Sequence, residues 1–175
     1  MLNAELRTRQ DLTPLLNARS VAIVGISELP RFGGVVYDNL RAFGYSGTIY
    51  GVNPKYRELF GLPCYPSLLD LPERPDLAIL ALPNSRLLGG LRDAAAMGIP
   101  AGAIFASANS GGADGEPTLQ AQLREIAAAS GMVICGPNCM GFHAFASRLP
   151  VSGYPITPLP AGNVTFITHS GSQFV

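Results

Sequence analysis

Short apolar runs alternate along the chain with longer segments whose apolar residues recur every three or four positions. The runs that resemble strands lie at residues 21–24, 48–53, 77–82, 103–106 and 132–135. Uninterrupted apolar runs are typical of strands buried on both faces, whereas the spacing of Leu87, Leu91 and Ala94 is typical of a helix. This alternation predicts an α/β fold built on a doubly wound parallel sheet.

The segments between the runs predict the other elements. Helices are expected at residues 11–19, 33–43, 85–97 and 116–130. Residues 56–66 contain Gly61 and Pro63 and are expected to be a connection, followed by a short helical turn at residues 67–71. The first domain therefore has five expected strands, each joined to the next through a helix or a connection.

Residues 20–34 join the first strand to a helix through a loop that contains glycines. Gly25 permits a close approach of the backbone that a side chain would prevent. The loop leads to a helix N-terminus, where unpaired N–H groups favour an anion. Because the glycines are not spaced as G-x-G-x-x-G, the dehydrogenase pattern is absent. A phosphate-bearing ligand is the first hypothesis, and a connection that binds nothing is the alternative.

Every expected strand ends in a polar or conformationally special turn. These turns occupy residues 25–27, 53–55, 83–85, 107–109 and 136–138. Ligands of open parallel sheets bind at the carboxyl ends of the strands, near the point where the strand order reverses. The five turns are therefore expected to ring one crevice.

The composition limits the classes of function. The chain has 175 residues, 47% of them apolar and 14% charged, with a net charge of zero. Such a balance does not favour nucleic-acid binding, and it suggests surface that other domains or subunits cover. Without an apolar run long enough to cross a bilayer and without a signal peptide, a cytoplasmic protein is expected, with no membrane partner. Cys64, Cys135 and Cys139 are expected to be reduced thiols, and no metal site is predicted.

The end of the chain differs in character from the rest. Four prolines fall within residues 149–162, which are expected to form a linker between domains. Residues 163–168 are expected to form a sixth strand, followed by a turn that should open a helix. This arrangement predicts the truncated start of a second α/β domain; the alternative is a sixth strand that completes the first sheet.

Five short motifs occur together in a fixed order. They are SVAIVGIS at residues 20–27, VNPKY at 52–56, YPS at 65–67, LALP at 80–83 and GPNCMG at 136–141. As a set they resemble the coenzyme A-binding domain of NDP-forming acyl-CoA synthetases, a family that includes ADP-forming acetyl-CoA synthetase and the α-subunit of succinyl-CoA synthetase.

The resemblance implies the organisation of a longer enzyme. Residues 1–148 would be a Rossmann-like CoA-binding domain, residues 149–162 a linker, and residues 163–175 the first strand and turn of a flavodoxin-like ligase domain. The full-length enzyme would be an acid–thiol ligase that converts acyl-CoA, ADP and phosphate into acid, CoA and ATP through a phosphohistidine. Since that histidine, the ATP or ADP site and its Mg²⁺ would belong to other regions, the chain is expected to bind CoA without turnover, and it supplies no catalytic residue.

The resemblance also implies the contacts to CoA. Backbone N–H groups of Gly25, Ile26 and Ser27 would bind the phosphates together with Arg31, and Lys55 would bind the 3′-phosphate. Residues 107–112 differ from the usual Ser-Ala-Gly-Phe, and His169 stands where relatives carry Gln. The residues expected to contact CoA are Gly25, Ile26, Ser27, Arg31, Phe32, Gly33, Asn53, Pro54, Lys55, Leu82, Pro83, Asn84, Ser107, Ala108 and Asn138.

Two other functions stay open from the residues alone. One is a non-catalytic module that senses CoA or a nucleotide, and the other is an NADP-binding oxidoreductase domain. An NAD enzyme would carry an acidic residue after the second strand, where this chain has the neutral Asn53. The expected partners are CoA, acyl-CoA and the remaining ligase domains or a second subunit, with a homo-oligomer as a further alternative.

Overall fold

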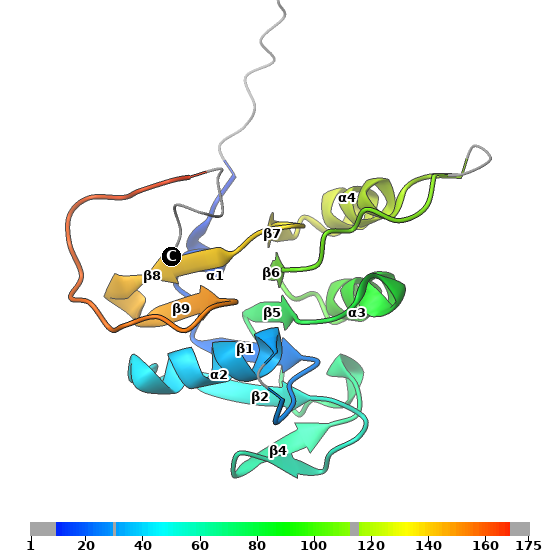
Figure 1. Ribbon diagram of the computed structural model, residues 1–175. Helices are drawn as coiled ribbons and strands as arrows, with labels where there is room; N and C mark the ends of the chain where they lie inside the picture. The colour runs from blue at the N-terminus through cyan, green and yellow to red at the C-terminus, as the bar shows by residue number, and fades with distance from the viewer. Residues whose placement is uncertain (1–9, 30, 113–115, 169–175) are drawn as a thin grey trace, which may run out of the picture.

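The computed structural model describes residues 10–29, 31–112 and 116–168. A seven-stranded sheet forms its centre, with strand order β3-β4-β2-β1-β5-β6-β7 (Figure 1). All neighbouring strands are parallel except β3 and β4. The strands are β1 (Ser20–Val24), β2 (Thr48–Val52), β3 (Glu58–Leu59), β4 (Leu62–Tyr65), β5 (Leu77–Leu80), β6 (Ala101–Ile104) and β7 (Val133–Cys135). The expected α/β class with a parallel sheet is confirmed.

The order of the strands reverses beside β1. From β1 the chain moves to β2 and β4 on one side, then returns to β5 on the other side and continues to β6 and β7. The connections that leave β1 and β5 therefore diverge, and the carboxyl ends of these two strands form the switch point of the sheet.

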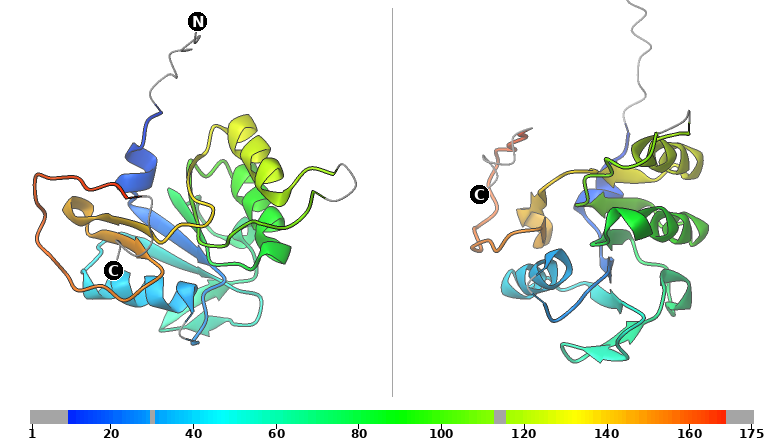
Figure 2. Two further views of the ribbon diagram at one scale, coloured as in Figure 1. Left: turned by 45° about the horizontal axis from the view of Figure 1, so that its top comes forward. Right: turned by 45° about the vertical axis from the view of Figure 1, so that its right-hand side comes forward.

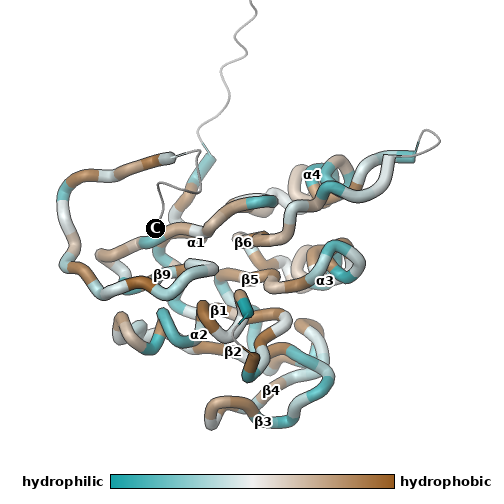
Figure 3. The backbone as a smooth tube through the Cα atoms, in the orientation of Figure 1, coloured by the Kyte–Doolittle hydropathy of each residue, from teal (hydrophilic) through white to brown (hydrophobic). Residues whose placement is uncertain are grey.

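Helices and short turns cover both faces of the sheet (Figure 2). The helices are α1 (Thr13–Leu16), α2 (Phe32–Ala42), α3 (Asn84–Ala96) and α4 (Leu119–Ser130), and η1 (Leu68–Asp70) is a 3-10 turn. Val21 and Ile23 of β1 pack into the core under α1 and α2, whereas Ala22 and Val24 pack into the core under α3, α4 and η1. Because both faces are covered, β1 is apolar from Val21 to Val24, while α3 and α4 alternate between apolar and polar residues (Figure 3).

A second, two-stranded sheet covers α2. Strands β8 (Gly141–Ala144) and β9 (Leu149–Ser152) pair antiparallel and are joined by the 3-10 turn η3 (Phe145–Ser147). Leu149 and Val151 are fully buried, so the expectation that a linker begins at residue 149 is wrong. The prolines suggested a linker, but Pro150 lies within β9. It is tolerated there because β9 pairs with β8 on one side only, so not every backbone N–H has to donate to a neighbouring strand.

The buried side chain of Asn39 on α2 holds the chain that follows β9. Its amide group donates hydrogen bonds to the carbonyl oxygens of Ser152, at 3.3 Å, and Tyr154, at 2.8 Å. Its oxygen accepts a hydrogen bond from the backbone N–H of Ile156 at 3.2 Å. The first domain thus extends past residue 148, to at least residue 156.

A hairpin occupies the segment that was expected to be a connection. Strands β3 and β4 pair through a two-residue turn, Phe60 and Gly61, whose φ angles are 55° and 74°. Two positive φ angles in succession are typical of a type I′ hairpin turn. This hairpin was not predicted from the sequence, because its strands are short and Pro63 interrupts the second one.

Other elements also differ from expectation. Helix α4 begins at Leu119 because Thr118 caps it, its hydroxyl oxygen accepting a hydrogen bond from the N–H of Ala121 at 3.2 Å. Strand β6 begins at Ala101, two residues before the expected start. Residues 163–168 form no strand within the described part of the chain, so the expected sixth strand is not observed. The turn expected after it, residues 169–175, lies outside the described residues, and the second domain stays a prediction.

Candidate functional site

The loop after β1 passes very close to the end of β5. Gly25 has a φ angle of 91°, and a Cβ atom at this position would lie 2.5 Å from the carbonyl oxygen of Ala81. The N–H of Gly25 donates to the carbonyl oxygen of Val52 at 2.8 Å, so the expectation that this N–H binds a phosphate is wrong. Gly25 serves the packing of three strand ends, and its substitution would test the fold as much as a ligand.

Two further glycines let α2 start directly against this loop. A Cβ atom on Gly33 would lie 2.9 Å from the carbonyl oxygen of Gly25, and one on Gly34 would lie 2.9 Å from that of Leu29. Arg31 stands at the N-cap position of the helix, and both Arg31 and Phe32 are exposed. The N-terminus of an 11-residue helix, with its partial positive charge, therefore lies against a loop that contains the hydroxyl of Ser27.

Asn53 joins the loop after β1 to the turn after β2. Its side-chain amide donates to the carbonyl oxygen of Ile26 at 2.7 Å, and its oxygen accepts from the backbone N–H of Lys55 at 3.1 Å. Both ends of the side chain are thus engaged within the protein. Asn53 positions the two turns, which is a more specific role than the contact with CoA that the sequence suggested.

A cavity of about 320 Å³ opens at the carboxyl ends of β1, β2 and β5, between η1 and α3. Four of the expected site residues line it: Gly25, Asn53, Pro54 and Leu82. The opposite wall of the cavity was not predicted from the sequence. Those further lining residues are Pro66, Ser67, Leu68, Ser85, Arg86, Gly89, Gly90 and Asp93.

The glycine pair in α3 is the sequence feature that could have indicated this wall of the cavity. Gly89 and Gly90 lie inside a helix, where each glycine costs about 1 kcal/mol relative to alanine. A Cβ atom on Gly90 would lie 2.7 Å from Cδ1 of Leu82, whereas one on Gly89 would meet nothing within 4 Å. Gly90 thus makes room for a neighbour in the protein, and Gly89 leaves open space on the cavity wall.

A hydrogen-bonded cluster joins the turns after β5 and β6. Asn84 accepts from the N–H of Ala108 at 3.1 Å and donates to the side-chain oxygen of Asn109 at 3.2 Å. The Ser107 hydroxyl donates to the same oxygen at 2.7 Å. Ala108 is buried with a φ angle of 51°, a strained conformation that this cluster holds in place.

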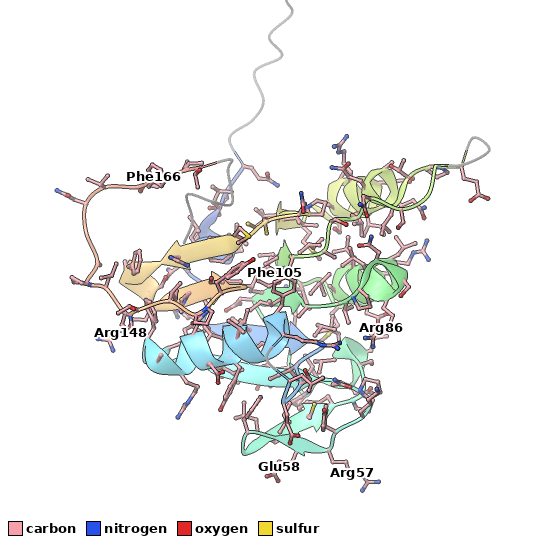
Figure 4. All side chains as sticks on the ribbon, in the orientation of Figure 1. Arg57, Glu58, Arg86, Phe105, Arg148 and Phe166 are labelled. Carbon is pink, nitrogen blue, oxygen red and sulfur yellow. The ribbon has the colours of Figure 1, made fainter. Side chains whose placement is uncertain are left out.

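The remaining expected residues lie along the same edge of the sheet but outside the cavity. Phe32 stacks on Phe105, with ring centroids 5.0 Å apart, and Figure 4 shows Phe105 beside the end of β6, with Arg86 on α3. Asn138 has a φ angle of 58° and donates its N–H to Ala106 at 2.8 Å. The exposed Lys55 is the last residue of the turn after β2. The parallel strands thus bring all five turns to one edge, but those after β6 and β7 do not line the cavity.

The described residues contain neither a metal-ligand cluster nor a membrane-spanning helix. No group of three or more His, Cys, Asp or Glu side chains there could hold a metal ion. None of the described helices is both long and apolar enough to cross a membrane.

Comparison with known proteins gives consistent matches over nearly the whole chain. A family model described as a CoA binding domain matches residues 19–144. A trans-feruloyl-CoA synthase of an unknown prokaryotic organism is 37% identical over 146 residues, which cover 83% of this chain and 21% of that protein. An ADP-forming acetate–CoA ligase of Archaeoglobus fulgidus is 35% identical over 161 residues, covering 90% of this chain and 23% of the relative. The chain therefore spans about a fifth of the length of these relatives.

Solved structures agree with the sequence matches. A dinucleotide-forming acetyl-coenzyme A synthetase of Candidatus Korarchaeum cryptofilum, in complex with phosphate and ADP, superposes with a TM-score of 0.73 at 32% identity. The match covers 84% of this chain and 32% of that one. A protein of Pyrococcus horikoshii superposes with a TM-score of 0.80 at 32% identity, over 93% of this chain and 37% of that one.

Proposed function

The chain belongs to the family of CoA-binding domains and matches the N-terminal part of NDP-forming acyl-CoA synthetases, and on this premise we propose that its CoA site is the carboxyl edge of the parallel sheet. The cavity at the switch point carries this proposal. It lies where open parallel sheets bind ligands, and the N-terminus of α2 lies against the adjoining loop.

The size of the cavity supports an assignment of the parts of the ligand. A volume of about 320 Å³ is at the lower end for a pocket that holds a small organic molecule, so it suits one part of CoA. We assign the adenosine to the cavity and the diphosphate to the loop with Ile26, Ser27 and Arg31. Exposed Lys55, beside the turn after β2, would meet the 3′-phosphate. The pantetheine would follow the remaining strand ends, which contain Leu82, Pro83, Ser107 and Asn138.

The function of the whole protein follows as a further part of the proposal. The full-length protein would be a cytoplasmic acid–thiol ligase that acts on acyl-CoA, ADP and phosphate. ATP or ADP, with Mg²⁺, would bind to ligase domains or a second subunit, which would also carry the phosphohistidine. The 175-residue chain would then bind CoA and catalyse no turnover.

Calorimetric titration of the chain with CoA, 3′-dephospho-CoA, NADP and NAD tests this function. We expect CoA to bind most tightly and 3′-dephospho-CoA to bind more weakly, with no binding of NAD. Tighter binding of NADP than of CoA would favour the oxidoreductase alternative. Turnover by this chain with acid, CoA and ATP would contradict the assignment of catalysis to other domains.

A pair of serine variants tests the location of the site. Ser27→Ala removes a hydroxyl from the loop after β1, and we expect a loss of about 0.5–1.5 kcal/mol in CoA binding. The matched control is Ser46→Ala, because exposed Ser46 lies at the opposite end of the sheet. Equal effects of the two variants would show that CoA does not bind at the carboxyl edge.

A further inference from the structure

Two thiols lie together where β7 ends. Cys135 is the last residue of β7, and Cys139 follows four positions later in the chain. Their Sγ atoms are 3.8 Å apart, and the thiol of Cys135 donates toward the sulfur of Cys139. Both residues are half-buried, so neither is sealed in the core. The proposed role in CoA binding gives no function to this pair.

The surroundings give the two sulfurs different chemistry. The hydrogen bond from Cys135 stabilises the thiolate of Cys139 and lowers the pKa of Cys139 to about 7. The same hydrogen bond, together with burial, raises the pKa of Cys135, which keeps its proton. When protonated, the thiol of Cys139 donates to the carbonyl oxygen of Ile104 at 3.3 Å. When ionised, its sulfur still accepts the hydrogen bond from Cys135.

The third cysteine provides a contrast. Cys64 lies on β4, which five strand spacings, or roughly 24 Å, separate from β7. It is buried, and its thiol donates to the carbonyl oxygen of Asn53 at 3.7 Å. Burial raises the pKa of Cys64, so Cys64 forms a thiolate less readily than Cys139 does.

We propose that Cys135 and Cys139 form a redox-active dithiol that reacts with low-molecular-weight disulfides, with Cys139 as the attacking residue and Cys135 as the resolving residue. The proximity of the two sulfurs supports this assignment, because Sγ atoms 3.8 Å apart are within reach of each other and the S–S bond of a disulfide is about 2 Å long. A metal site at the two thiols is a weaker alternative, because no His, Cys, Asp or Glu among the described residues joins them as a third ligand.

The reaction balances as two thiol–disulfide exchanges. The Cys139 thiolate attacks one sulfur of the disulfide RSSR, the S–S bond breaks, and RS⁻ leaves and takes up a proton. Cys135, after transferring its proton to solvent, attacks the Cys139 sulfur and releases the second RS⁻. The products are a Cys135–Cys139 disulfide and two RSH molecules, so the protein loses two electrons and the reagent gains them.

Glutathione disulfide is the probe for the test. The full chain is incubated with it, remaining thiols are alkylated, and the products are identified by intact and peptide mass spectrometry. We expect a Cys135–Cys139 disulfide in the parent chain, with Cys64 alkylated. In Cys135→Ser the exchange stops after its first step, so a glutathione adduct should accumulate on Cys139. In Cys139→Ser, the remaining Cys135 should stay unmodified, and Cys64→Ser should behave as the parent chain does.

Other patterns would overturn the proposal. Adducts on Cys64 as abundant as those on Cys139 would show general thiol exposure, and the absence of both disulfide and adduct would show an inert pair. The pH dependence of alkylation is an independent readout: the rate at Cys139 should reach half its maximum near pH 7 in the parent chain. In Cys135→Ala, which has no hydrogen-bond donor at this position, the midpoint should rise, because the Cys139 thiolate loses the hydrogen bond from Cys135. An unchanged midpoint would contradict the assigned roles.

Discussion

The side-chain amide of Asn53 donates a hydrogen bond of 2.7 Å to the carbonyl oxygen of Ile26, which ties the turn after β2 to the loop after β1. These two segments are separated by a helix in the chain and meet only in the folded sheet. The same side chain accepts a hydrogen bond from the N–H of Lys55, so it fixes the segment that carries the lysine. The proposed phosphate and ribose contacts therefore share one positioning residue.

Replacing Asn53 should loosen both turns. Asn53→Ala leaves the carbonyl of Ile26 and the N–H of Lys55 without this partner, and we expect a loss of about 1–2 kcal/mol in the free energy of unfolding. CoA should bind more weakly because its contacts are no longer pre-organised. Urea unfolding and calorimetric titration measure the two effects. Asn17→Ala at the opposite end of the sheet is the control, and equal binding by both variants would contradict the role of Asn53.

Lys55 is the single lysine of the sequence and is exposed beside the turn after β2. Lys55→Ala should weaken CoA binding by about 1.5–3 kcal/mol, the range of a charge-assisted hydrogen bond, and should leave 3′-dephospho-CoA binding nearly unchanged. Arg86→Ala is the comparison, because Arg86 lines the cavity from α3. If Arg86→Ala alone discriminates between the two ligands, the 3′-phosphate binds at α3.

Gly89 allows stability and binding to be separated. Gly89→Ala should raise the free energy of unfolding by up to about 1 kcal/mol, because alanine is the better helix former and its methyl group meets no protein atom. The methyl group would occupy space on the cavity wall, so CoA should bind more weakly. Thermal unfolding and titration measure the two quantities. A stabilised variant with unchanged affinity would remove this wall from the adenosine site.

The buried hydroxyl of Tyr45 should make the fold less stable at alkaline pH. Its hydroxyl donates to the carbonyl oxygen of Ala18 at 2.9 Å, and burial raises its pKa to about 12. In the unfolded chain the Tyr45 hydroxyl ionises near pH 10. The contribution of Tyr45 to the free energy of unfolding is therefore complete below about pH 10 and is lost as the pH rises toward about 12. Unfolding free energies over this interval should fall less steeply in Tyr45→Phe. The exposed Tyr154→Phe is the control and should retain the parent's slope.

The sequence predicted those parts of the fold that depend on local pattern. Residues 21–24 of β1 and all residues of β5 are apolar and buried, because the parallel sheet is covered on both faces. The Gly25 turn and the end of β5 were correctly expected at one edge, since parallel strands end on the same side. The hairpin of β3 and β4 was missed because two-residue and four-residue strands carry too little pattern to be distinguished from a loop.

The alternation of strands and helices, the polar turns and the family motifs were thus determined by the sequence itself, because each depends on residues that are close in the chain. Only the tertiary structure decided that Asn53 bonds to Ile26, that α3 supplies the far wall of the cavity, and that β9 packs on α2. These contacts join residues far apart in sequence. Several depend on whether a carbonyl oxygen or a side chain is already engaged in another hydrogen bond. Local propensity carries no information on such pairings, since the free energy that selects them comes from burial and hydrogen bonds formed only when the whole domain has assembled.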